Sequence, residues 1–399
     1  MKNRELLIAN GIIIMSVFCF VIFTFNIFSN QTIKEILNET LTNIVKEDKS
    51  DNLPMFTKCS TKDSLNLNTQ QDENLIKLAE YQDICDSYVT NKLMFFTHIP
   101  FDQTSAQELA FTIATKLDLF KQNNIQPIVI VEPYTGGNLL RYRDFLNGVY
   151  NKPLDTFFFE LKQRGVTDEM MGTWVPFPES NTPNWDNKDT EPSDFGIVVN
   201  TYLRSLKKYF PNAKGSILLN ATTYEPDDVL WDNGDYISLA PYLVNIDKTL
   251  VDSFGIQGFP WAPNAQFNAQ EIFRASEFIQ PDIAIGAAQE LRTRDVWINT
   301  GSFYQKYTND EEKRITISLN DRKAILEGII EVAKYIKNYQ LNEYRVEINL
   351  FSEDKSNYNE ATDWSYMQND EHKEMLKEFL LTAEEEEIPI SLFDKSTIE

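Results

Sequence analysis

The stretch TWVPFPESNTPNW, residues 173–185, ends an apolar run on groups that can do chemistry. The carboxyl group of Glu179 can donate or accept a proton, and the amide of Asn181 can bind hydroxyl groups. The indole of Trp185 offers a flat apolar face. An acid, an amide and an aromatic ring so close together suit the binding and acid-catalysed cleavage of a polyhydroxy substrate.

The overall composition argues against several other kinds of function. A formal net charge of −23 disfavours a nucleic-acid partner, because a phosphate backbone binds to basic surfaces. The chain has two histidines, His98 and His372, which argues against a histidine-based metal site or a Ser-His-Asp triad. We therefore expect neither a metal nor a cofactor.

Short apolar runs that alternate with helical patterns must position these groups. The runs are 92–101, 127–134, 169–177, 215–224, 252–261, 282–291, 345–351 and 388–394. Helical spacing marks residues 106–120, preceded by a capping box of Ser105 and Glu108, as well as 325–336 and 371–383. This alternation predicts an α/β protein, a (β/α)8 TIM barrel. A doubly wound sheet is the competing layout, but its glycine-rich loop is missing after the first run.

The working residues of such a barrel lie at the carboxyl ends of its strands. Read as a strand, DIAIGAAQEL (282–291) alternates so that Glu290 points inward at the barrel mouth. Two carboxylates across the mouth, Glu179 and Glu290, would suit glycoside hydrolysis. The alternatives are a loop acid that caps a strand end for Glu179, and an ion pair with Arg292 or Arg294 for Glu290.

Four segments also resemble family 26 of the glycoside hydrolases, the β-mannanase-like members of the large retaining clan of (β/α)8 glycosidases. They are PIVIVEPY, WVPFPESNTPNW, VDSFGIQGFPW and IAIGAAQEL, within residues about 93–300. The resemblance implies a retaining enzyme on a β-linked polysaccharide, with Glu179 as acid/base and Glu290 as nucleophile. Pro178 stands where the family has histidine and Phe259 where it has an aromatic hydroxyl. These departures keep a second hypothesis open, a catalytically inactive glycan-binding barrel.

Further polar and aromatic residues at the strand ends are candidates for substrate binding. They are His98, Glu132, Asn181, Trp185, Tyr224, Trp231, Trp261 and Arg292. Counted along the chain, the two catalytic acids follow the third and sixth strands, whereas in the clan they follow the fourth and seventh. The spacing of three is kept, and we expect the C-terminal strand to close the barrel at the first-strand position.

The N-terminal part of the chain differs from the rest. Lys2 and Arg4 precede an apolar run, residues 6–28, about long enough to cross a bilayer as a helix. The basic flank predicts a cytoplasmic N-terminus and an extracytoplasmic barrel. We expect a single-pass membrane anchor (1–29), a polar stalk (30–90) and the barrel (91–399). A cleaved signal is the alternative for the anchor, and Cys59 and Cys85 can pair or stay as thiols.

Overall fold

The structure of the chain is a computed structural model. The described residues are 56–58, 88–135, 138–182, 190–221, 239–260, 275–302, 305–306, 315–341, 344–351, 354–355, 362–363, 366 and 369–393. Contacts divide the chain into Met1–Met55 and Phe56–Glu399, and every described residue belongs to the second unit. The predicted anchor, Cys59 and Cys85 lie outside the described residues. Within them, no helix combines the length and the apolar character that crossing a membrane requires.

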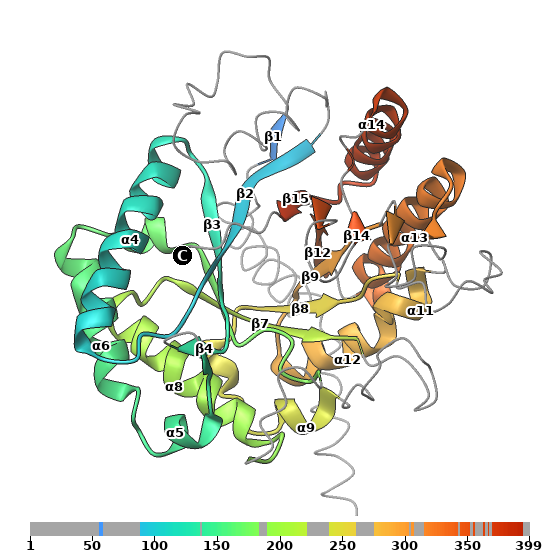
Figure 1. The fold of residues 1–399 in the computed structure, drawn as a ribbon. Coiled ribbons are helices and arrows are strands. Elements are labelled where there is room, and N and C mark those ends of the chain that lie inside the picture. The colour runs from blue at the N-terminus through green and yellow to red at the C-terminus, as the bar shows by residue number, and fades with distance from the viewer. Residues whose placement is uncertain are drawn as a thin grey trace, which may run out of the picture. The chain divides into compact units, whose positions relative to one another are not determined.

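Eight parallel strands form a closed barrel, which confirms the predicted fold (Figure 1). Each strand pairs with the next along the chain, and the last pairs with the first, so that the sheet has no free edge. The strands are β2 (Tyr88–Thr97), β3 (Gln126–Val131), β6 (Thr173–Pro176), β7 (Lys214–Asn220), β8 (Ser253–Gln257), β9 (Asp295–Thr300), β12 (Arg345–Phe351) and β15 (Ile390–Phe393).

Helices connect successive strands on the outside of the barrel (Figure 1). The longer ones are α4 (Gln103–Gln122), α6 (Asn151–Gln163), α8 (Asp194–Tyr209), α12 (Pro281–Leu291), α13 (Leu319–Lys337) and α14 (Asp370–Glu385), and the shorter ones are α5 (Tyr142–Leu146), α7 (Asp168–Met171), α9 (Leu239–Leu243), α11 (Ala275–Ile279), η2 (Lys248–Leu250) and η3 (Tyr339–Leu341). The three helices predicted from periodicity correspond to α4, α13 and α14. The capping box of α4 was predicted one turn late, because Asp102 is the N-cap and Ser105 its partner.

Two small antiparallel sheets lie in the loops that follow barrel strands. The hairpin of β4 (Tyr134–Thr135) and β5 (Asn138–Leu139) follows β3. The loops after β9 and β12 together form a sheet of β10 (Gln305–Lys306), β11 (Ile315–Thr316), β13 (Asp354–Lys355) and β14 (Thr362–Asp363). All these loops leave the carboxyl ends of strands, the end we call the mouth. A short strand, β1 (Phe56–Lys58), pairs antiparallel with β2 at the other end.

One predicted strand was wrong, because residues 282–291 are helical. Pro281 occupies the first helical turn, and the buried positions Ala284, Ala287, Ala288 and Leu291 follow helical spacing. Alternation and helical periodicity both fit so short an apolar run, and its alanines favour the helix. The sixth strand is β9, the next segment along the chain, which the sequence reading missed.

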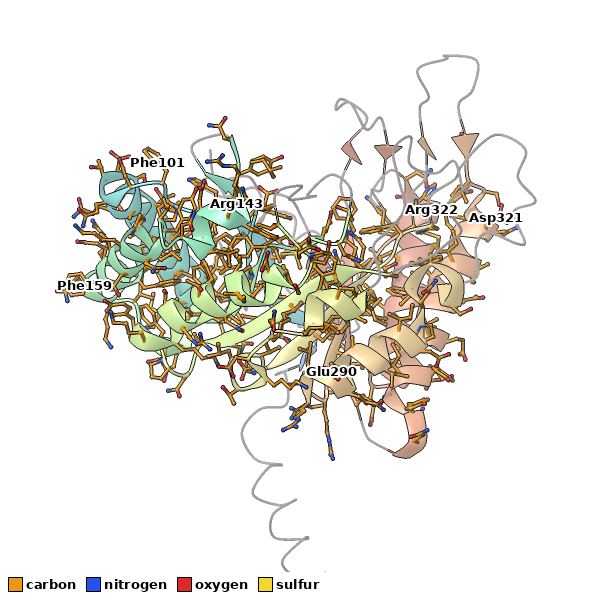
Figure 2. The ribbon with its side chains drawn as sticks, turned by 90° about the horizontal axis from the view of Figure 1, so that it is seen from below. Phe101, Arg143, Phe159, Glu290, Asp321 and Arg322 are labelled. Atoms are coloured by element: carbon orange, nitrogen blue, oxygen red, sulfur yellow. The ribbon has the colours of Figure 1, made fainter. Side chains whose placement is uncertain are left out.

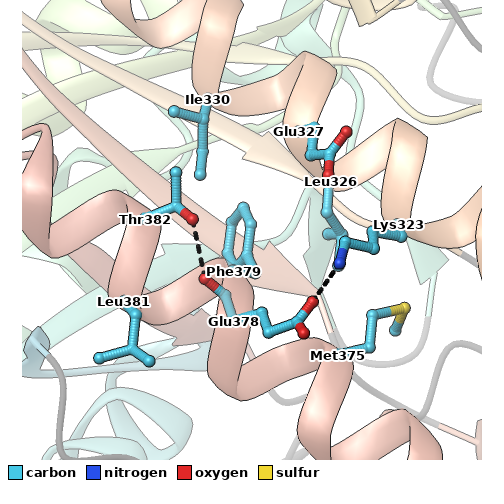
Figure 3. A pocket seen from close by; sticks show the side chains of 9 residues that line it. All are labelled: Lys323, Leu326, Glu327, Ile330, Met375, Glu378, Phe379, Leu381 and Thr382. Atoms are coloured by element: carbon cyan, nitrogen blue, oxygen red, sulfur yellow. Dashed lines mark hydrogen bonds and ion pairs between the residues drawn. The ribbon is translucent and has the colours of Figure 1, made fainter.

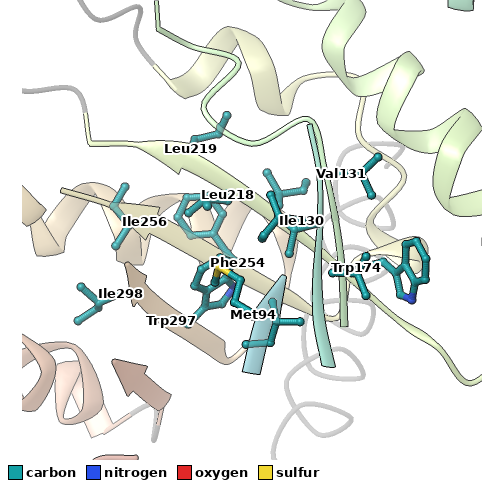
Figure 4. Packing of buried hydrophobic residues seen from close by; sticks show 14 of the residues in the cluster. Met94, Ile130, Val131, Trp174, Leu218, Leu219, Phe254, Ile256, Trp297 and Ile298 are labelled. Carbon is teal, nitrogen blue, oxygen red and sulfur yellow. The ribbon is translucent and has the colours of Figure 1, made fainter. Parts of the chain in front are cut away.

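The strands divide their side chains between the helices and the barrel interior. A Cβ on Gly215 would meet Leu203 of α8, so the odd-numbered residues of β7 face the helices. Trp174 of β6 likewise packs against Phe158 of α6. Ser216 therefore points inward, where it accepts a hydrogen bond from the indole of Trp297 two strands away (2.9 Å). Figure 4 shows Trp174 and Trp297 among the buried side chains of these strands.

Candidate active site

The loop after β6 carries the predicted acid Glu179 on a constrained backbone. Phe177 and Glu179 both adopt a left-handed conformation, with φ of 55° and 59°. Such angles cost about 1–3 kcal/mol in a residue with a side chain, and they gather at active sites. Glu179 N donates to Leu218 O of β7 (3.0 Å), so the backbone of the acid is fixed to the neighbouring strand. The loop therefore holds Glu179 in one place at the mouth.

Asn181 holds this loop to the end of β7. Its Nδ2 donates to Asn220 O and its Oδ1 accepts from Asn220 N, both at 2.9 Å. Ser180 Oγ donates to Phe177 O (2.7 Å) and lies 2.5 Å from Tyr142 Oη. Asn181 has no exposed surface. It was predicted to bind substrate, but its carboxamide is used to position Glu179.

The carboxylate of Glu179 is the first member of a hydrogen-bonded chain across the mouth. Gln257, the last residue of β8, donates from Nε2 to Glu179 Oε1. Gln257 Oε1 in turn accepts from Asn299 Nδ2 of β9 at 2.5 Å. The side chain of Glu179, which follows β6, thus contacts β8, two strands further around the barrel. Gln257 and Asn299 were not among the predicted site residues.

His98 and Glu132 lie at the mouth on the other side of Glu179. They follow β2 and β3 in the positions that continue the inward-facing residues Phe96 and Ile130. Burial lowers the pKa of His98, so the neutral imidazole is favoured. Burial raises the pKa of Tyr134, and the nearby carboxylate of Glu132 raises it further. The structure thus brings His98 and Glu132 to the same end of the barrel as Glu179.

Glu290 and Arg292 lie at the opposite end of the barrel, which corrects their prediction as site residues. Glu290 is in the last turn of α12 and Arg292 is its C-cap, just before β9 begins. Glu290 forms an ion pair with Lys248 at 2.6 Å, ahead of the start of β8. This ion pair lowers the pKa of Glu290. Figure 2 shows Glu290 on the side of the barrel away from Arg143, whose helix α5 follows β3 at the mouth.

Glu290 therefore cannot act together with Glu179 on one bond. The prediction failed because it assumed the strand parity of a segment that is helical. The alternative, a structural ion pair, is the correct one, although the partner is Lys248 rather than either nearby arginine. The four aromatic candidates Trp185, Tyr224, Trp231 and Trp261 lie outside the described residues.

A signal for Asn299 was present in the sequence. Residues 295–300, DVWINT, alternate apolar Val296 and Ile298 with Trp297 and Asn299. That pattern, rich in β-branched and aromatic residues, is typical of a strand and would have placed Asn299 inward at a strand end. Across the part of the chain that the structure describes, no group of histidine, cysteine or acidic residues could hold a metal ion.

A surface groove with a volume of about 340 Å³ lies on the outside of the barrel, between α13 and α14 (Figure 3). Aliphatic and aromatic side chains form its base, among them Leu326, Ile330 and Phe379. Its Lys323 and Glu378 pair with each other at the edge. The two acids of the groove, Glu327 and Glu378, lie beside Lys323 on the outer helices, and the catalytic candidates lie elsewhere, at the mouth.

Comparison with known proteins gives likenesses of fold. No family model matches the chain, and no curated protein matches it. Similar solved structures include an endo-β-1,4-mannanase from Thermotoga petrophila (11% identity over 73% of this chain and 70% of that chain, TM-score 0.44). Others are a β-glucosidase from Thermotoga maritima (11% identity, 84% and 94%, TM-score 0.44) and an exo-β-1,4-mannosidase from Opitutaceae bacterium strain TAV5 (13% identity, 81% and 57%, TM-score 0.49).

These names are those of glycoside hydrolases, the class of protein whose motifs the sequence resembles. The chain spans little more than half the length of the exo-mannosidase. At identities of 11–13% the likeness concerns the fold alone. The function of this chain must therefore be argued from its own residues.

Proposed function

We propose that the chain is a glycoside hydrolase that cleaves a β-linked glycan, with Glu179 as the proton donor. The observation that carries the proposal is the left-handed backbone of Glu179, which holds its carboxyl group at the barrel mouth against Gln257. Protonation of the glycosidic oxygen by such a fixed acid makes the sugar a better leaving group. The motif resemblance supports a β-linked polysaccharide such as a mannan as the substrate.

The reaction also needs a second carboxylate. The resemblance places it three strands beyond the acid, and that position is the end of β9. Asn299 stands there, and an amide cannot form the covalent ester of a retaining enzyme. Of the described residues at the mouth, Glu132 is the carboxylate that can serve, as a nucleophile or as a base for water. The first-formed anomer, read by ¹H NMR, distinguishes retention from inversion.

The test compares Glu179→Gln with Glu290→Gln. Glutamine has no acidic proton to transfer, so Glu179→Gln should lower the hydrolysis of unactivated β-glycans by about 10²–10⁴-fold. Activated aryl glycosides should lose much less at the bond-breaking step, because their leaving groups need little protonation. Glu290→Gln is the matched control and should leave both rates unchanged. Equal losses on the two substrates for Glu179→Gln would contradict the assignment.

A second candidate function is a glycan-binding barrel without hydrolysis. Asn299 favours it, because an amide stands where the resemblance requires an acid. This candidate predicts that β-glycans bind to the chain without release of reducing ends, and that Glu179→Gln leaves that binding intact. Measurable reducing-end release that depends on Glu179 would exclude it.

We also propose that the barrel is extracytoplasmic and tethered by residues 1–29. The support is the sequence alone: an apolar run, residues 6–28, that follows Lys2 and Arg4. Protease added to intact cells that express the chain should digest the barrel, while a cytosolic control protein survives. Protection of the barrel until the cells are lysed would contradict this location.

A further inference from the structure

Five consecutive strands place a polar side chain at register-paired positions that face the barrel interior. Register pairs Asn220 with Gln257, Gln257 with Asn299, Asn299 with Asn349, and Asn349 with Ser391. Paired residues of parallel strands share a face, and Ser216 two residues before Asn220 points inward. We call these five residues the amide row.

Part of the amide row is buried without hydrogen-bond partners. Asn299 Oδ1, both polar atoms of the Asn349 carboxamide and Ser391 Oγ have none among the described residues. Each of these three residues is 1% exposed. Buried polar groups in native proteins are almost always hydrogen-bonded, because desolvation without a partner is unfavourable. Three neighbouring residues with unpartnered polar atoms therefore point to a ligand with several hydroxyl groups.

The surroundings of the amide row restrict the shape of that ligand. Beneath it, two residues earlier on β9 and β12, lie the indole of Trp297 and the ion pair of Glu347 with Lys92. The other wall of the interior is apolar, with Met94, Ile130 and Val175 from β2, β3 and β6. A ligand that reached the amide row from the mouth would meet amides on one side and hydrocarbon on the other. A pyranose ring has this character, because its edge carries hydroxyl groups and its faces carry C–H groups.

We propose that Asn299, Asn349 and Ser391 form a subsite that binds the hydroxyl groups of one sugar unit inside the barrel. The inference deepens the proposed function, on which it rests, because it assigns the recognition of a single pyranose to side chains other than Glu179. Hydrogen bonds of Gln257 to Asn299 and to Glu179 connect the subsite to the acid. The closed layer of Trp297 and Glu347 below predicts that a chain end, rather than a chain interior, enters.

The test titrates the full-length chain with D-mannose, D-glucose, D-galactose and D-xylose by calorimetry, alone and with single substitutions. Asn349→Leu removes the unpartnered Nδ2 and Oδ1 of the carboxamide, and leucine is similar in size to asparagine. It should weaken the binding of the preferred sugar by about tenfold or more, and leave the melting temperature unchanged or higher. Ser391→Ala, a smaller change that retains the fold, should weaken binding by about threefold or more.

Asn200→Ala is the matched control, because this buried amide is fully bonded on the outside of the barrel. Its Nδ2 donates to Asn245 O (2.7 Å) and its Oδ1 accepts from Asp247 N (2.8 Å). We expect a lower melting temperature and unchanged sugar binding. If no sugar binds, or if Ser391→Ala and Asn349→Leu bind as the unchanged chain does, the subsite is wrong.

The experiments can refute the proposed hydrolysis and the proposed subsite independently of each other. Sugar binding that depends on Asn349, in a chain that releases no reducing ends from any β-glycan, would uphold the subsite and reject only the hydrolysis. Hydrolysis that depends on Glu179 but is insensitive to Asn349→Leu and Ser391→Ala would reject the subsite and uphold the hydrolysis.

Discussion

Glu179 acquires its role from the residues that hold it rather than from its own chemistry. Sixty acidic residues are present in the chain, and most of those that the structure describes lie on the outer helices. Glu179 differs because its backbone is left-handed, its N–H is bonded to β7 and its carboxylate is bonded to Gln257. These constraints give a fixed orientation, which is what a general acid requires.

Asn181 attaches the loop that carries Glu179 to the end of β7, and its substitution gives a prediction. Asn181→Ala leaves the buried N–H and C=O of Asn220 without partners, so the free energy of unfolding should fall by about 1–3 kcal/mol. Urea denaturation measures the change. Hydrolysis should fall as well, because the loop that carries Glu179 loses its attachment to β7.

Ser205→Ala, which removes a hydroxyl bonded within α8, is the control and should change neither quantity appreciably. Unaltered stability in Asn181→Ala would show that the two bonds to Asn220 contribute nothing net.

The two histidines give a prediction about pH. Burial lowers the pKa of both His98 and His372 below the ordinary value of 6.5, and the positive charge of Arg322 lowers that of His372 further. The unfolded chain then binds more protons than the folded chain as the pH falls through 6.5. Folding stability carried by these groups is therefore present above pH 6.5 and is lost below it.

NMR titration of the imidazole Cε1–H signals measures both values, and His98→Gln assigns the two resonances. Each signal should titrate below pH 6.5 in the folded chain. A midpoint above that value for either signal would contradict the burial argument.

At the scale of elements, β9 and the helix that follows it are linked by a buried cation. Arg322, in the first turns of α13, is fully buried. Its Nη2 donates to Ser302 O (2.5 Å), just past the end of β9, and its guanidinium lies 4.5 Å from the ring centroid of Tyr366. Tyr366 Oη in turn accepts from Ser302 N (2.8 Å). Segments after β9 and β12 are thereby joined beside the mouth.

Arg322→Lys should break this link despite keeping the charge. The guanidinium of arginine is planar, whereas the ammonium of lysine is not. A lysine therefore cannot stack on the ring of Tyr366 and also donate to Ser302 O in the same geometry. We expect the free energy of unfolding to fall by about 1.5–3 kcal/mol, the contribution of a hydrogen bond to a charged group. Thermal and urea denaturation measure it. The exposed neighbour Lys323→Arg is the control, and an equal effect of both substitutions would argue against a specific role for Arg322.

The whole molecule depends on closure of the barrel by its last strand. β15 pairs with β12 on one side and with β2 on the other, so it joins the two ends of the barrel sheet. The interior residues of eight strands are covered from water only when that pairing is complete.

Two truncations test this organisation. Removal of residues 1–50 should give a soluble protein that unfolds in one cooperative transition, because the barrel does not need them. Removal of residues 388–399 should abolish that transition, since β2 and β12 lose their shared partner. Circular dichroism during heating measures both. A cooperative transition in the variant that lacks residues 388–399, or aggregation of the variant that lacks residues 1–50, would contradict this organisation.

The amino-acid pattern alone was enough to predict the (β/α)8 class, seven of the eight barrel strands and the position of Glu179 after the third. It could do so because apolar periodicity reports which face of each segment is buried. For residues 282–291 two periodicities fitted equally well, and the choice depended on the neighbouring segment 295–300, whose Trp297 fills the interior over Gly255.

The contacts between polar side chains of different strands could not be predicted from the sequence. Gln257, Asn299, Asn349 and Ser391 are separated along the chain, and the register of four strands places them side by side. Helix α12, which ends just before β9 begins, puts Glu290 at the opposite end of the barrel from Glu179. Spacing along the chain cannot supply such contacts, because they arise from pairing between segments that a local pattern does not describe.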